Sequence, residues 1–166
     1  MNTAVKLPNP PDHLSPGTIL QRLVDGSGFR YNLATKDLRD EDFDFRPVAS
    51  SMSIFELNKH IYHLYRLTTI SLGINWNSKP DDNFVSYRDL TFQLISAISE
   101  RLSAITDEEL EQVNIHLKRI EKDFPHWYLI NGFLADALTH IGQMISWRRI
   151  NGNPVDRISP FTGEPF

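Results

Sequence analysis

The sequence of 166 residues contains no cysteine. Disulfides, thiol nucleophiles and thiolate metal ligands are therefore excluded, and a metal site in this chain has to use imidazole nitrogen and carboxylate oxygen. A chain without disulfides fits a reducing compartment. If a thiol takes part in a reaction here, it has to come from a cosubstrate.

Long apolar runs are also missing, because none approaches the roughly 20 residues that a membrane-spanning helix needs. The first residues, MNTAVKLPNPPDHLSPG, contain no apolar segment of the kind found in secretory signals. We therefore expect a cytoplasmic protein without a membrane partner.

Concentrated positive charge is a third absence. The formal net charge is −4, and Lys118-Arg119 and Arg148-Arg149 are isolated basic pairs. Proteins that bind nucleic acid through the phosphate backbone usually carry a basic stripe. The charge pattern therefore predicts no nucleic-acid partner.

What the sequence does contain is the balance of a globular protein, with 40% hydrophobic and 23% charged residues. The length suits one domain over residues 1–166, with a proline-rich extended lead-in at 1–17 and an irregular tail at 155–166. Between them, apolar residues recur at helical spacing in four segments, about 18–38, 53–73, 86–105 and 125–151. This pattern predicts an all-α fold, an antiparallel four-helix bundle.

Two parts of the pattern are less regular. Gly26 and Gly28 weaken the first helical segment and predict a break or bend there. In residues 112–119, apolar and polar side chains alternate at a strand-like period, so we expect a short strand or an irregular crossover before the last helix.

The second helical segment carries a histidine where leucine is expected. Ser53 and Glu56 have the spacing of a capping box that begins this helix. His60 then interrupts an apolar stripe of Leu57, Leu64 and Leu67 at helical spacing.

The last helical segment breaks its stripe in the same way. Asp136 and His140 are four residues apart, which puts their Cβ atoms about 5–6 Å from each other. A buried carboxylate needs a partner. We predict that both residues meet His60 in the bundle core, either as three ligands of one divalent metal ion or as a buried hydrogen-bonded cluster. The apolar residues of this stripe are Leu129, Phe133, Ala137, Met144 and Trp147.

Other polar residues are candidates for supporting roles. His63 lies three residues from His60 on a more polar flank, so we expect it beside the site or on the surface. Gln143 and Arg148 are candidates for contacts to a ligand or to a metal-binding residue, although Arg148 also fits a polar helix face. Glu56 is a conceivable general base that is better explained as a helix cap.

The segments FRPVASSMSIFELNKHIYHL and WYLINGFLADALTHIGQMISWRRINGNP resemble the second and last helices of the DinB-like superfamily, also called YfiT-like metal-dependent hydrolases. In that family a histidine-x-x-x-histidine pair precedes Gly-Gln, and an arginine and Gly-x-Pro follow. The similarity covers about residues 20–154, and the Gly142-Gln143 context makes it specific. Asp136 stands where the common pattern has the first histidine.

The resemblance implies a four-helix bundle, often dimeric, in which His60, Asp136 and His140 hold a divalent ion such as zinc or nickel. Iron and manganese also suit two histidines and a carboxylate. Because Asp136 replaces a histidine of the common pattern, the site is anionic. The resemblance therefore assigns no precise activity of the family to this chain. Related families use low-molecular-weight thiols.

Two functions remain open at this stage. One is a metal-dependent enzyme that uses a metal-bound water or a small thiol for hydrolysis or thiol transfer on a small molecule. The other is a non-catalytic, metal-containing helical protein with a binding or stress-response role. We expect a homodimer in either case.

Overall fold

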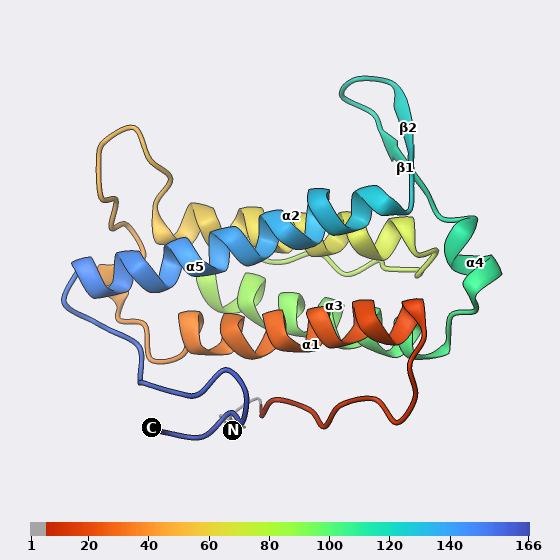
Figure 1. The fold of residues 1–166 in the computed structure, drawn as a ribbon. Coiled ribbons are helices and arrows are strands. Elements are labelled where there is room, and N and C mark those ends of the chain that lie inside the picture. Colours follow the sequence, from red (N-terminus) through yellow and green to blue (C-terminus); the bar gives the residue numbers. More distant parts are fainter. Residues whose placement is uncertain (1–5) are drawn as a thin grey trace.

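The computed structural model describes residues 6–166 and contains four long helices (Figure 1). They are α1 (Pro16–Thr35), α2 (Ile54–Ser71), α3 (Phe84–Ala104) and α5 (Ala135–Ile150). Shorter elements connect them: η1 (Asp40–Asp42), α4 (Asp107–Glu111), β1 (Asn114–Leu117), β2 (Lys122–Pro125) and η2 (Leu129–Leu134). The predicted all-α bundle is confirmed.

Each long helix packs against two others, so that α3 and α5 both contact α1 and α2. Figure 1 shows α1 and α5 running in one direction and α2 and α3 in the other. Residues 73–83 therefore return along the bundle before α3 begins. As a result, α2 and α5 are antiparallel neighbours, and side chains from their facing flanks can meet.

The first helix is continuous, so of the break or bend predicted at the glycines, the break is wrong. Gly28 instead serves helix packing, because a Cβ atom there would lie 2.9 Å from the Cγ2 atom of Ile95 on α3. The helix begins at a capping box in which the Ser15 hydroxyl accepts a hydrogen bond from the Thr18 N–H at 3.1 Å. Burial of the α1–α3 contact outweighs the low helix propensity of glycine.

The capping box predicted for α2 is confirmed. The Ser53 hydroxyl accepts from the Glu56 N–H at 3.2 Å, and the Glu56 carboxylate accepts from the Ser53 N–H at 2.8 Å. Arg46 donates to the same carboxylate at 2.6 Å. These contacts, the arginine first, lower the pKa of Glu56 to about 2. Glu56 is thus a cap and not a free base.

The strand expected before the last helix is confirmed, but its partner was not predicted. β1 pairs antiparallel with β2, with Ile115 opposite Phe124, and the hairpin projects from one end of the bundle (Figure 1). Pro125 ends β2, although the sequence suggested that it begins the last helix. The Ile115 side chain is buried, which explains the alternating pattern.

The last helix starts with a wider turn. η2 is a π-helix, and it runs directly into α5. The residues of α5 that face the core are Ala137, Ile141, Met144 and Arg148. This stripe differs from the predicted one, which passed through His140 and Trp147.

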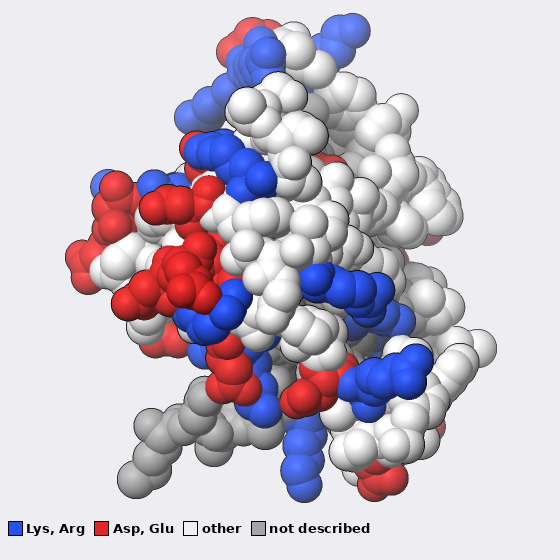
Figure 2. All heavy atoms as spheres, turned by 90° about the vertical axis from the view of Figure 1, so that its left-hand side faces the viewer, with Lys and Arg blue, Asp and Glu red and all other residues white. Residues whose placement is uncertain are grey.

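The surface mixes charges of both signs. Figure 2 shows one end of the molecule, where acidic side chains gather on one side with Lys and Arg side chains among them. No helix among residues 6–166 has the length and hydropathy that crossing a membrane requires.

Candidate metal centre

The three predicted ligands come together between α2 and α5. The Nε2 atom of His60 lies 3.4 Å from Oδ2 of Asp136, and Nε2 of His140 lies 3.3 Å from Oδ1. One ligand atom from each residue can be chosen so that all lie within 4.8 Å of one another. We call His60, Asp136 and His140 the triad.

These spacings suit a metal ion. Bonds of about 2.0–2.1 Å from zinc to nitrogen or oxygen place neighbouring ligands of a tetrahedral site about 3.3 Å apart. Both imidazole–carboxylate spacings in the triad lie close to this value. The two imidazole rings meet edge to face, with centroids 4.6 Å apart and an interplanar angle of 82°. The chemistry and the spacing of the donor set both fit a divalent transition metal.

The triad lies at the edge of the bundle, not in its core as the sequence suggested. The side chains of His60, Asp136 and His140 are 35%, 47% and 16% exposed. On α5 the buried stripe runs one residue away from Asp136 and His140, and on α2 Leu67 is exposed instead of joining a seam with His60. The ligands therefore occupy the flanks where the two helices meet solvent.

Gln143 orients His140, as its position in the sequence suggested. Its Oε1 atom lies 2.8 Å from Nδ1 of His140. Because an amide oxygen only accepts hydrogen bonds, this contact assigns the imidazole proton to Nδ1. The lone pair of Nε2 then points to Asp136. Such a partner for the outer nitrogen is typical of metal-binding histidines.

His63 does not join the triad. It is exposed, and its ring packs edge to face on Tyr62 with centroids 5.5 Å apart. Desolvation by its neighbours lowers the pKa of His63, and the positive charges of Arg66 and Lys59 act in the same direction.

Arg148, a candidate for ligand contacts, has a structural role instead. It is 3% exposed, and its Nη1 atom donates to the carbonyls of Leu33, Ala34 and Lys36 at 3.0, 3.2 and 2.6 Å. Its Nε and Nη2 atoms donate to the Asn153 carbonyl and side chain. The guanidinium thus ties the end of α5 to the end of α1.

Asp42, which the sequence analysis missed, completes this arrangement. Its fully buried carboxylate accepts hydrogen bonds from Arg39, Asn151 and Asn153 at 2.6–3.1 Å. Burial alone would raise the pKa of Asp42, but the donors, Arg39 first, outweigh it and hold that pKa far below its ordinary value. Residues 39–44 are mostly charged and include the acidic run Asp40–Asp42. This composition is typical of a solvated loop, so it did not predict the burial of Asp42. We call Arg39, Asp42, Arg148, Asn151 and Asn153 the anchor cluster.

The triad faces solvent without an enclosing cavity. The best-formed cavities of residues 6–166 lie elsewhere, and no triad residue lines them. Coordination positions on the outer side would therefore be reachable from solution.

Comparison of the sequence with protein-family models and with curated proteins gives no match. Comparison of the structure with solved structures finds a similar one. It is the crystal structure of a DinB-like protein, YjoA, from Bacillus subtilis, with a TM-score of 0.57 and 18% sequence identity. The similarity covers 79% of this chain and 92% of YjoA. The chain therefore has the DinB-like fold, as the two sequence segments suggested.

Proposed function

We propose that the triad binds one divalent metal ion, with zinc or nickel as the first candidates and iron or manganese also suited to the ligand set. The observation that carries the proposal is the convergence of two imidazole nitrogens and a carboxylate within 4.8 Å. The contact between Gln143 and His140 supports it, because it leaves the Nε2 lone pair available. A hydrogen-bonded cluster explains the arrangement less well, since the Nε2 contacts to Asp136 are long for hydrogen bonds.

We further propose that the chain is a metal-dependent enzyme acting on a small molecule. When bound, a divalent ion supplies Lewis acidity for hydrolysis or for transfer of a thiol. The triad offers three protein ligands, and the exposure of Asp136 and His60 leaves space for a substrate on the outer side. With no cysteine in the sequence, a thiol would come from a low-molecular-weight cosubstrate. Glu56 is held by Arg46 and Ser53, so it is not offered as a base.

The alternative is a non-catalytic metal protein, and one observation favours it. The triad lies at an exposed edge, and the best-formed cavities of residues 6–166 lie elsewhere, so the chain alone provides few walls for a substrate. A cobalt-loaded protein tests thiol transfer, because its visible spectrum reports new ligands. Glutathione should change the spectrum if a thiol reaches the ion, and an unchanged spectrum would rule out thiol transfer, one of the two proposed reactions.

Metal content tests the proposed site itself. Wild type, His140→Ala and His63→Ala should be purified identically and analysed for bound metals. We expect about one ion per chain in wild type and in His63→Ala, and a loss of most of it in His140→Ala, since two protein ligands remain. Equal metal content in all three would refute the site. Light scattering on the same samples tests the homodimer, which remains a prediction.

A further inference from the structure

A second polar feature, independent of the triad, lies between α1 and α3. Asp25 is 7% exposed, and it lines a cavity of about 430 Å³. Its Oδ1 atom accepts a hydrogen bond from the Ser99 hydroxyl at 2.6 Å. Cavities of this size are typical of sites for small molecules.

Asp25 has fewer hydrogen-bond partners than the other buried carboxylate. The other buried carboxylate, Asp42, accepts five hydrogen bonds, two of them from an arginine side chain. Asp25 accepts one, from a neutral hydroxyl, and takes part in none of the ion pairs found among residues 6–166. A carboxylate has about four acceptor sites, and burying it without a counter-charge is costly. The acceptor sites that Ser99 does not use are therefore available to a ligand in the cavity that Asp25 lines.

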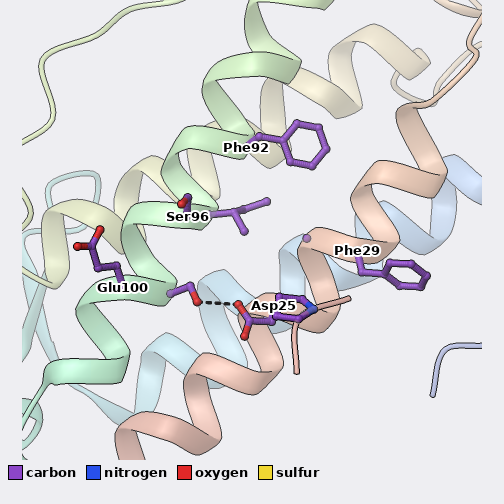
Figure 3. Close-up of a pocket in the computed structure, with 9 residues that line it drawn as sticks. Asp25, Phe29, Phe92, Ser96 and Glu100 are labelled. Atoms are coloured by element: carbon purple, nitrogen blue, oxygen red, sulfur yellow. Dashed lines mark hydrogen bonds between the residues drawn. The ribbon is translucent and has the colours of Figure 1, made fainter. Parts of the chain in front are cut away.

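The walls of the cavity restrict the kind of partner. Figure 3 shows Asp25 and Phe29 on α1, and Phe92, Ser96 and Glu100 on the neighbouring helix α3, where Glu100 projects away from Asp25. Pro8 also lines the cavity, and its carbonyl accepts a hydrogen bond from Arg22 at 2.7 Å. Most of the lining surface is apolar, with one carboxylate buried and a second, Glu100, exposed.

We propose that this cavity binds an organic ammonium ion with a short apolar or aromatic body. The ammonium group supplies the positive charge and the donors that Asp25 lacks, and the phenylalanine rings contact the body of the ligand. The site is separate from the triad, so its occupation does not depend on a metal ion.

A matched pair of probes tests this inference. Benzylamine is a cation at pH 7, and benzyl alcohol is its neutral isostere. In a titration followed by backbone amide NMR shifts, benzylamine should shift residues 25–29 and 95–100 and saturate, while benzyl alcohol should bind at least about tenfold more weakly. Equal affinity for the two probes, or no saturable shift at these residues, would overturn the proposal.

Three variants locate the interaction. Asp25→Asn, which keeps the shape and an acceptor for Ser99, should weaken benzylamine binding at least about tenfold. Asp107→Asn removes the same charge on α4, away from the cavity, and should leave the affinity unchanged. Ser96→Phe should block the cavity and abolish binding without touching the carboxylate. If Asp25→Asn binds benzylamine as wild type does, Asp25 is only a structural group and the proposal fails.

Discussion

Two groups of polar residues, the anchor cluster and the triad, each include side chains of the last helix and differ in one respect. In the anchor cluster at its end, the buried acceptors and donors are paired with one another, so that Asp42 and Arg148 leave little bonding capacity unused. In the triad, the ring nitrogens of His60 and His140 meet one carboxylate at 3.3–3.4 Å on a face open to solvent. The first arrangement is complete within the protein, and the second brings three possible metal ligands within 4.8 Å of one another.

This contrast separates structure from function more reliably than residue type does. Arginine, aspartate and histidine were all candidates for a site on sequence grounds. A polar group saturated by backbone carbonyls contributes mainly to stability, because breaking it leaves several buried groups without partners. A convergent, unsaturated group contributes little to stability and is available for a ligand. Changes in the two groups should therefore affect different measurements.

The largest loss of stability should follow replacement of Arg148. Arg148→Met leaves the carbonyls of Leu33, Ala34 and Lys36 without their donor, so we expect the free energy of unfolding to fall by about 3 kcal/mol or more. Urea denaturation measures this loss. Arg149→Met, an exposed neighbour on the same helix, is the control and should change stability by less than about 0.5 kcal/mol. Similar stability of the two variants would contradict the structural role of Arg148.

A smaller, pH-dependent loss should follow replacement of Asp42. At pH 7, Asp42→Asn should lower the free energy of unfolding by about 2 kcal/mol, because an amide cannot accept all of the donors around it. Since the folded-state pKa is depressed, the carboxylate stabilises the fold above its unfolded pKa of about 4, and this contribution is lost as the pH falls towards the folded pKa.

Denaturation curves between pH 7 and pH 2 measure this effect. The difference between wild type and Asp42→Asn should be constant from pH 7 to about 5 and shrink below about pH 4. A difference that stays constant down to pH 2 would show that the charge of Asp42 contributes nothing.

The triad should show the opposite behaviour, with small effects on stability and clear effects on metal affinity. Gln143→Ala removes the contact that fixes the tautomer of His140, so zinc affinity should fall about 10- to 100-fold. His63→Ala, on the exposed flank of α2, should change it less than about twofold. Calorimetric titration of zinc into metal-free protein provides both values. Equal zinc affinities for the two variants would show that Gln143 does not support the metal site.

The sequence predicted the bundle and the residues of the triad because both depend on local spacing. The capping box at Ser53 and the four-residue interval from Asp136 to His140 are short-range patterns, and the structure reproduces them. The predicted burial of the triad was wrong. A π-helix precedes α5, and the buried stripe of α5 runs beside the ligands instead of through them. The spacing of apolar residues alone does not show which of two neighbouring residues on a helix faces the core.

Long-range partners were beyond the reach of the same reasoning. Arg148 meets α1 more than a hundred residues away, and Asp42 lies in a segment whose acidic composition indicates a solvated loop. Likewise, β2 has few apolar residues, and only its pairing with β1 makes it a strand. In each case the deciding contact depends on tertiary structure, not on the neighbouring sequence.

Anomalous diffraction from crystals grown with zinc is the most direct test of the central claim, that the triad is a metal site. The account predicts one strong anomalous peak between α2 and α5, about 2.0–2.2 Å from Nε2 of His60, from an oxygen of Asp136 and from Nε2 of His140. The exposed hairpin offers a control on the same molecule, since His116 and Asp123 lie 2.9 Å apart there. A zinc peak at the hairpin with none at the triad, or no bound zinc at all, would contradict the account.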